Sequence, residues 1–253
     1  IRFIKRFLKL FYIVFFILAL FSSKASAEPT WVHKIDITSE EDKPNGFTFN
    51  NDGTKMFIIG HTEDEVIEYT LSTAWNVSTY SLVDSFSTKS ESGYSRDVKF
   101  SQDGTKMFVL GGSANGDEDG LDSVCEYTLS TGFDVSSTVT FIDCFSAPQE
   151  AKPEELEFNP DGTKMFIMGE SGDDVNEYTL STGFDVSTAS FVDSFSTKTQ
   201  DSQSRDVKFN QDGTKMFVLG QINIAVCEYT LSIGFDLSST VTFIDCKSLS
   251  PVG

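Results

Sequence analysis

Several residue types that mark catalytic and metal sites are scarce or absent from this sequence of 253 residues. It has two histidines, six prolines and four cysteines. It contains no Cys-x-x-Cys pair, no Gly-x-Ser-x-Gly, no glycine-rich phosphate loop and no His-Glu-x-x-His. The usual signatures of zinc sites, serine hydrolases, nucleotide hydrolases and metalloproteases are therefore missing. Beyond residue 27, no stretch of about ten residues shows the i, i+3, i+4 apolar spacing of a helix, which argues against helical classes.

Positive charge is also scarce. The chain has 19 Lys+Arg against 38 Asp+Glu, a formal net charge of −19. A surface this acidic repels phosphate backbones and anionic lipid, so we expect no nucleic-acid partner and instead a protein or another cationic or neutral surface ligand. Phenylalanine is plentiful, with 24 residues, and 39% of the chain is hydrophobic. That is enough apolar material for a sizeable core.

The first 27 residues differ from the rest of the chain. They hold five basic residues and no acidic one, an unbroken apolar run over 10–21, and the small residues Ala25, Ser26 and Ala27. This order predicts a secretory signal peptide over residues 1–27, cleaved after Ala27, and export to the periplasm, the cell surface or the medium. A membrane anchor is the alternative, but the apolar run spans only about 18 Å of a hydrocarbon core of roughly 30 Å. We therefore expect no membrane insertion after cleavage.

One hexapeptide, Asp-Gly-Thr-Lys-Met-Phe, occurs four times, starting at residues 52, 103, 161 and 212. A period near 50 residues, with four short β-rich runs and glycine punctuation, is typical of a propeller blade. We expect an all-β fold over residues 28–253: a β-propeller of four-stranded antiparallel blades at approximately 45–92, 93–147, 152–198 and 203–248. A lone strand is expected over 31–37. Because the last repeat already has its own fourth strand, this lone strand predicts an incomplete ring, cut from about six to eight blades.

The third repeat carries the clearest family resemblance. Its sequence Phe-Asn-Pro-Asp-Gly-Thr-Lys-Met-Phe, at 158–166, resembles the Phe-Ser-Pro-Asp-Gly-Lys hairpin of bacterial YVTN-type and Tol-type β-propeller repeats. The resemblance covers roughly residues 31–246 and implies a fold, while such propellers serve as binding platforms, scaffolds and, less often, enzymes. We expect a non-enzymatic binding or scaffold module. The alternative is a propeller-type hydrolase or lactonase whose catalytic residues lie partly outside this sequence.

The cysteines occur as two pairs with equal spacing. Cys125 and Cys144 lie in the second repeat, Cys227 and Cys246 lie in the fourth, and the other two repeats have neither partner. If the third and fourth strands of a repeat form a hairpin, each pair faces across it at about 4.5–5.5 Å, within disulfide reach. Both cysteines of a pair occur in the same repeats, and an exported protein reaches an oxidising compartment. Both observations favour two disulfides, each within one blade. Four buried thiols are the alternative.

Three residues are candidate ligand-binding groups. Arg96 and Arg205 begin the first strands of the second and fourth repeats, where the other repeats have Asn-Gly (45–46) and Glu-Glu (154–155). In a propeller this strand lines the central channel, so a guanidinium there could hold an anionic group. An ion pair between blades is the alternative. His61 lies in an acidic loop, where a base or metal-binding role competes with simple solvation.

A loop in the second repeat fits the calcium pattern Asp/Asn-x-Asp-x-Asp-Gly, which places alternate oxygens around a hard cation. Calcium is the one cofactor suggested by the sequence, and an acidic loop without metal is the alternative. The candidate ligands are Asn115, Asp117, Asp119 and Asp122.

Each repeat also has a glutamate in its third strand and an aspartate in its fourth. The glutamates are at 68, 126, 177 and 228, and the aspartates at 84, 143, 193 and 245. They could form carboxylate rings, but outward-facing polar positions of a sheet are the simpler explanation.

Overall fold

The repeats form four antiparallel sheets of four strands each. The computed structural model describes residues 34–112, 123–150 and 152–249. The strands of the first two sheets are β1 (Pro44–Phe49), β2 (Lys55–Gly60), β3 (Glu65–Leu71), β4 (Tyr80–Ser87), β5 (Gly93–Phe100), β6 (Lys106–Gly112), β7 (Ser123–Leu129) and β8 (Val139–Ser146). Those of the last two are β9 (Pro153–Phe158), β10 (Lys164–Gly169), β11 (Asp174–Leu180), β12 (Ala189–Ser196), β13 (Ser204–Phe209), β14 (Lys215–Gly220), β15 (Ala225–Leu231) and β16 (Val241–Ser248).

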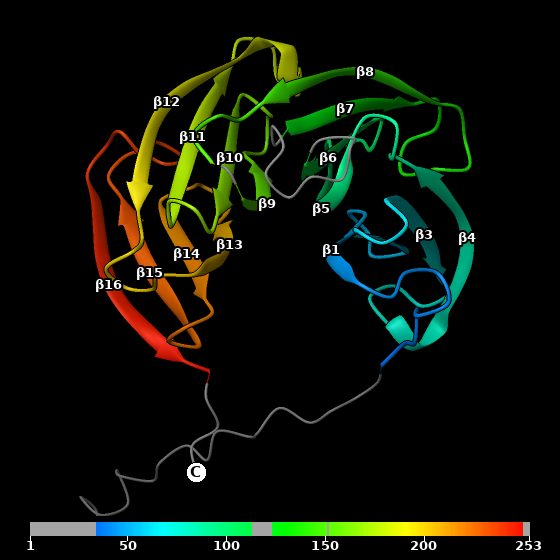
Figure 1. Ribbon diagram of the computed structural model, residues 1–253, viewed down its shortest axis with the longest axis horizontal. Coiled ribbons are helices and arrows are strands. Elements are labelled where there is room, and N and C mark those ends of the chain that lie inside the picture. The colour runs from blue at the N-terminus through cyan, green and yellow to red at the C-terminus, as the bar shows by residue number, and fades with distance from the viewer. Residues whose placement is uncertain (1–33, 113–122, 151, 250–253) are drawn as a thin grey trace, which may run out of the picture. The chain divides into compact units, whose positions relative to one another are not determined.

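The sheets are arranged in a ring as a four-bladed β-propeller, which confirms the expected fold class. Within each sheet the strands pair in sequence order. Figure 1 shows β1, β5, β9 and β13 toward the centre and β4, β8, β12 and β16 at the periphery. Two single-turn 3-10 helices, η2 (Val77–Thr79) and η3 (Val186–Thr188), precede two of the peripheral strands. The described part of the chain contains no helix with the length and apolar character needed to cross a membrane.

The repeated Asp-Gly-Thr forms the turn of the first hairpin in every sheet. In the second sheet Gly104 has φ +71°, a left-handed conformation that other residues resist. The Asp103 carboxylate accepts hydrogen bonds from the Thr105 amide at 3.0 Å and from its hydroxyl at 2.8 Å. Hydrogen bonds from Thr105 and Ser101 hold the pKa of Asp103 below its usual range. The turn is therefore specified locally, and its repetition sets the register of four hairpins.

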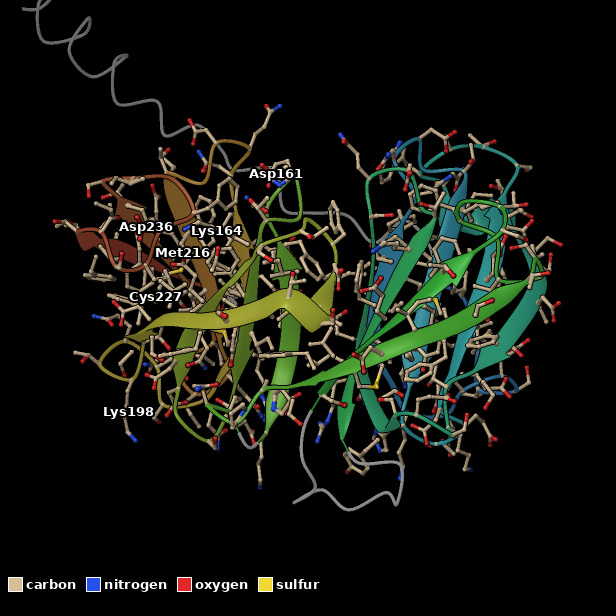
Figure 2. All side chains as sticks on the ribbon, turned by 90° about the horizontal axis from the view of Figure 1, so that it is seen from above. Asp161, Lys164, Lys198, Met216, Cys227 and Asp236 are labelled. Carbon is tan, nitrogen blue, oxygen red and sulfur yellow. A yellow bond between two sulfur atoms is a disulfide. The ribbon has the colours of Figure 1, made fainter. Side chains whose placement is uncertain are left out.

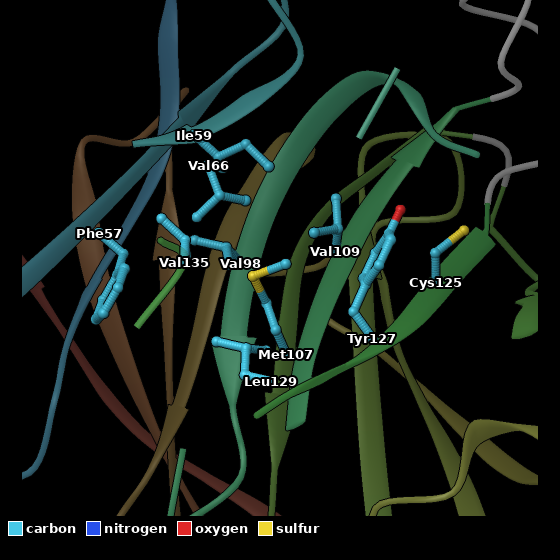
Figure 3. Close-up of a cluster of buried hydrophobic side chains, with 10 residues drawn as sticks. All are labelled: Phe57, Ile59, Val66, Val98, Met107, Val109, Cys125, Tyr127, Leu129 and Val135. Carbon is cyan, nitrogen blue, oxygen red and sulfur yellow. The ribbon is translucent and has the colours of Figure 1, made fainter. Parts of the chain in front are cut away.

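The second strand of each sheet is apolar on both faces, and in the second and third sheets both faces lie against a neighbouring sheet. Figure 3 shows one such junction, where Phe57, Ile59 and Val66 of the first sheet pack against residues of the second, including Val98 and Met107. Equivalent clusters join the second sheet to the third and the third to the fourth. The core is thus divided into layers between sheets.

Both predicted disulfides are confirmed. Cys125 faces Cys144 in the β7–β8 ladder, and Cys227 faces Cys246 in the β15–β16 ladder. The Cα atoms are 4.1 Å and 4.0 Å apart. At the same register the first sheet has Ile67 opposite Ser85, without a cross-link.

The explanation of the repeated glutamates as outward-facing is wrong for three of the four. Glu68, Glu126 and Glu177 are at most 2% exposed because each lies against the next sheet. Glu126 forms an ion pair with Lys106 at 2.7 Å, and its second oxygen accepts the amide of Val186 from the following sheet at 3.0 Å. Two further pairs have the same geometry, and we call the three pairs the junction pairs: Lys55–Glu68, Lys106–Glu126 and Lys164–Glu177.

The lysines of the junction pairs also reach the next sheet. Lys55 donates to the Phe133 carbonyl oxygen and Lys106 to that of Phe184, each at 2.6 Å. In Figure 2, Lys164 of β10 lies beside Asp236, which belongs to the equivalent loop of the fourth sheet. A lysine and a glutamate on one sheet therefore hold the backbone of a loop on the next.

Two features at the ends of the series differ from the repeat. The strand expected over 31–37 is absent from its described part, since residues 34–37 have no regular structure. Among the described residues no strand pairs with them, and Ile35 and Ile37 instead pack against the first sheet in a cluster with Met56, Ile58 and Tyr69. In the described residues, no buried cluster joins the fourth sheet to the first.

Candidate functional site

The four inner strands border a central pocket of about 670 Å³, within the usual size range of small-molecule sites. Its charged side is formed by Asp97, Lys99, Glu154, Glu155, Glu157, Arg205, Asp206 and Lys208. Its apolar side includes Phe47, Phe49 and Trp75 of the first sheet and Leu219 of the fourth.

The third sheet breaks the repeat at this pocket. Strands β5 and β13 both read Arg-Asp-Val-Lys, at 96–99 and 205–208, whereas β9 reads Glu-Glu-Leu-Glu at 154–157. Alternate residues of a strand share one face, so β9 presents glutamates where β5 and β13 present an aspartate and a lysine. Because β9 lies between β5 and β13, its glutamates meet lysines from both neighbours.

Glu155 is the centre of this arrangement. Its carboxylate is 2.9 Å from Lys99 Nζ and also pairs with Lys208, while its side chain is only 11% exposed. Burial, together with the nearby Asp97 carboxylate, raises the pKa of Glu155 to about 8, against the opposing effect of the two lysines. Glu155 can therefore take up or release a proton near neutral pH.

Lys99 remains a cation beside it. Its Nζ is 2.7 Å from Asp97 as well as 2.9 Å from Glu155. Burial would lower the pKa of Lys99, but the carboxylates of Asp97 and Glu155 outweigh it and raise the pKa. The pocket thus combines a titratable carboxyl with a fixed positive charge.

The two predicted arginines meet on one carboxylate. Glu154 is 3.3 Å from Arg96 Nη1 and 2.8 Å from Arg205 Nη1, and Arg205 also pairs with Glu170. Burial raises the pKa of Glu154, although both guanidinium groups oppose it. The arginines expected to hold an external anion therefore form ion pairs between sheets, and their partner is a glutamate of β9.

His61 joins the same group through an aromatic ring. It stacks on Tyr94 with ring centroids 4.5 Å apart, and the Arg96 guanidinium lies 4.5 Å from the centroid of the same ring. Its Nδ1 is 2.8 Å from Asn45 Nδ2. Burial, followed by the charges of Arg96 and Lys43, lowers the pKa of His61, so the imidazole is neutral at pH 7. The structure therefore brings His61, Arg96 and Arg205 into one chain of contacts.

The predicted calcium site lies outside the described residues. This applies to all four candidate ligands, Asn115, Asp117, Asp119 and Asp122. Within the described ranges there is no cluster of three or more His, Cys, Asp or Glu residues that could hold a metal ion. Glu126, which follows that loop, is engaged in a junction pair.

Sequence reasoning missed Glu155, Lys99 and Lys208 as candidate residues. The signal was present, because the Glu-Glu at 154–155 departs from the Arg-Asp of two other repeats. A residue required once in a repeat protein is expected at such a departure. The role of Glu155 depends on Lys99 and Lys208, which belong to two other sheets, and only the fold brings these lysines close to it.

The fold resembles solved structures of limited sequence similarity. A Bacteroides uniformis protein assigned provisionally as a 6-phosphogluconolactonase aligns with TM-score 0.56 and 13% identity, covering 81% of this chain and 55% of that one. A Lactobacillus plantarum protein aligns with TM-score 0.55 and 13% identity, over 81% and 57%. The periplasmic gluconolactonase of Pseudomonas aeruginosa aligns with TM-score 0.52 and 16% identity, over 82% and 57%.

At these identities the structural similarity shows a shared fold. This chain spans a little over half the length of those proteins. No protein-family model matches the sequence, and no curated protein matches it.

The comparison corrects the expected function. The sequence led us to expect a non-enzymatic binding or scaffold module, whereas two of these structures are described as lactonases. They favour the alternative, a propeller-type hydrolase or lactonase, and the non-enzymatic interpretation is withdrawn. It relied on the scarcity of histidine and of nucleophile motifs, and it did not single out Glu155 as an acid–base group.

Proposed function

We propose that the central pocket hydrolyses an uncharged cyclic ester, with Glu155 as the general base. The observation that carries the proposal is a nearly buried carboxylate on the wall of the pocket, held between Lys99 and Lys208. General bases work best when their pKa lies close to the working pH. The raised pKa of Glu155 meets this condition.

The reaction needs one proton acceptor and one site of positive charge. Glu155 takes a proton from a water molecule as the water oxygen bonds to the ester carbonyl carbon. Lys99 and Lys208 stabilise the negative charge that develops on the carbonyl oxygen. When the ring carbon–oxygen bond breaks, the ring oxygen receives the proton from Glu155. The products are one carboxylic acid group and one hydroxyl on the opened chain.

The charges of the pocket favour an uncharged substrate. Five carboxylates line it against three cationic side chains. Each of the cations is already paired with a carboxylate: Lys99 with Asp97, Arg205 with Glu154 and Lys208 with Glu157. A phosphorylated lactone would be repelled by the surplus of negative charge. Gluconolactone fits this environment better than its phosphate ester.

The test compares acid release from glucono-δ-lactone by the protein and by its Glu155→Gln variant, with the spontaneous rate subtracted. We expect the variant to lose about 10²–10⁴-fold in kcat/KM, the usual contribution of a general base. Glu63→Gln is the matched control, because Glu63 is exposed and lies outside the residues that line the central pocket, and it should retain activity. An unmodified protein that does not accelerate acid release, or an equally active Glu155→Gln variant, contradicts the proposal.

The pH dependence gives a second criterion. Below its raised pKa the Glu155 carboxyl is protonated and cannot act as a base, so kcat/KM should rise with pH and level off above about 8. Any activity remaining in Glu155→Gln should lack this rise. A rate that falls as the pH approaches 8 would assign the catalytic role to a protonated group instead.

We also propose that the chain is exported with residues 1–27 removed, and that its repeats belong to the YVTN-type or Tol-type group. Two disulfides support an oxidising destination. The resemblance of the fold to a periplasmic protein agrees with it.

A further inference from the structure

One register position of the inner strands carries a different charge pattern in each sheet. It pairs with Ile59, Leu110, Met168 and Leu219 of the second strands, and its occupants are Gly46, Asp97, Glu155 and Asp206. Asp97 is the most deeply buried of the three carboxylates, at 1% exposed. It lies at the junction between the second and third sheets, beside the proposed base.

Asp97 joins the second sheet to the backbone of the third. Its Oδ2 accepts the amide of Leu156, the residue after Glu155, at 3.1 Å. The same oxygen is 2.7 Å from Lys99 Nζ, and Oδ1 accepts the Val98 amide at 2.8 Å. Three donors of this kind stabilise the negative charge of a buried carboxylate. Asp97 therefore fixes the part of β9 that carries Glu155.

The first sheet leaves room for this carboxylate. It has Gly46 where the other three sheets have an acidic residue, and a Cβ there would lie 2.8 Å from both Cα and Oδ1 of Asp97. That distance is shorter than a normal contact between these atoms, so any other residue at 46 would force Asp97 or the β1 backbone to move. The glycine of the first sheet and the buried aspartate of the second thus belong to one arrangement.

Asp97 also shares a lysine with Glu155. Lys99 Nζ is 2.7 Å from Asp97 and 2.9 Å from Glu155, so one ammonium group serves two carboxylates. The other charged groups around Glu155 are Asp206 and Lys208 of β13 and Glu157 of its own strand. Burial raises the pKa of Glu155, and the charge of Asp97 raises it further.

We propose that Asp97 is a positioning residue for the hydrolysis described above. It anchors the β9 backbone beside Glu155, and it holds one side of Lys99 so that Glu155 does not have this cation to itself. A carboxylate in an undivided ion pair stays ionised at low pH and is a weak base. This role depends on the proposed function, because Asp97 acts on the substrate only through Glu155.

The experiment titrates Glu155 directly. Carbon-13 NMR of protein labelled at the glutamate side-chain carboxyls follows each group with pH, and the Glu155 signal is the one absent from Glu155→Gln. Asp97→Asn keeps an oxygen for the Leu156 amide but removes the charge, so the midpoint of the Glu155 titration should fall by about 1–3 pH units.

Asp143→Asn is the matched control. Asp143 is exposed on β8 of the same sheet, and its carboxylate also accepts the amide of the following residue, at 2.8 Å. The substitution removes the same charge far from the pocket and should leave the Glu155 midpoint unchanged. An equal fall in both variants would overturn the proposal, because it would reflect the net charge of the protein.

Asp97→Ala separates the anchor from the charge. It removes both the charge and the acceptor of the Leu156 amide, so it should lower the Glu155 midpoint as Asp97→Asn does and should also have a lower Tm than Asp97→Asn. Circular dichroism gives the Tm of each variant. Equal Tm values would overturn the anchoring part of the role.

Kinetics connect the titration to the reaction. In Asp97→Asn, the rise of kcat/KM for glucono-δ-lactone should move to lower pH by the same interval as the Glu155 midpoint. An unchanged midpoint, or a rise that does not follow it, would overturn the role of Asp97. A shifted midpoint in a protein that does not accelerate lactone hydrolysis would instead confirm the effect of Asp97 on Glu155 and overturn the proposed function.

Discussion

The second and fourth sheets have nearly the same sequence but different surroundings. Both carry the hexapeptide, a disulfide and the strand Val-Cys-Glu-Tyr-Thr-Leu. The second sheet lies between two neighbours, and its Phe108, Leu110 and Glu126 are at most 2% exposed. The equivalent Phe217, Leu219 and Glu228 of the fourth sheet are half-buried. The comparison isolates the effect of a covering sheet, because the residues are the same and only the neighbour differs.

The difference also shows that a repeated residue can have two energetic roles. Glu126 is an almost fully buried charge whose oxygens are satisfied by Lys106 and by the Val186 amide. Glu228 makes an equally short ion pair in partial contact with solvent. Buried and exposed ion pairs respond very differently to loss of one partner. Substituting Glu126 and Glu228 therefore measures how much of the stability of the junction depends on the neighbouring sheet.

The largest expected effect is at Glu126. Glu126→Ala leaves Lys106 without its carboxylate and the buried Val186 amide without an acceptor, so we expect a loss of about 3–5 kcal/mol in the free energy of unfolding. Glu228→Ala, the matched change on the fourth sheet, should cost less than about 1 kcal/mol. Urea unfolding of the two variants and of the unmodified chain provides the measurement. Equal losses would show that the covering sheet contributes nothing to the junction pair.

The disulfides should not follow this difference between the sheets. Each closes a loop with a sequence separation of 19 residues, and the chain-entropy model gives about 3 kcal/mol for a loop of that length wherever it lies. We expect Cys125→Ser with Cys144→Ser to cost about as much as Cys227→Ser with Cys246→Ser. Thermal unfolding of the two double variants compares them. A much larger loss in the second sheet would mean that packing around Cys125, and not loop closure, dominates.

Local features of the fold were predictable from the sequence, and features that depend on contacts between sheets were not. The Asp-Gly-Thr turns and the pairing of Cys125 with Cys144 follow from short-range spacing and the two-residue period of a strand. Glu126 was taken for an outward-facing residue because its own strand gives no sign of the sheet that covers it. The carboxylate of Glu155 was missed for the same reason, since its partners Lys99 and Lys208 are more than 50 residues away in the chain.

The candidate site shows most clearly how much of a functional site the sequence alone can predict. Arg96, Arg205 and His61 were selected as unusual residues near the mouth of the channel, and the structure does place them in one chain of contacts. Their charges are balanced by Glu154 and Glu170, which lie on a different sheet from either arginine. Sequence can identify which residues depart from a repeat. Which of them remain available to a ligand depends on pairing across sheets.

The smallest expected effect extends the comparison to the third sheet, which lacks a disulfide. At the register of the cysteines it has Asn176 opposite Ser194, and the Ser194 hydroxyl donates to Asn176 Oδ1 at 2.6 Å. Asn176 is 1% exposed, and within the described residues its Nδ2 has no hydrogen-bond partner. A buried donor without an acceptor costs about 1–3 kcal/mol, and the first sheet has isoleucine at this position, Ile67, opposite Ser85. We therefore expect Asn176→Ile to raise the free energy of unfolding by about 1 kcal/mol, with a rise in Tm of about 2–4 °C for a chain of this size.

Ser194→Ala is the control, because it removes the hydroxyl that bonds Asn176 while keeping the buried amide, and it should lower Tm. A loss of stability in Asn176→Ile would show that an ordered water satisfies the Asn176 amide and that the polar pair stabilises the third sheet in its own way.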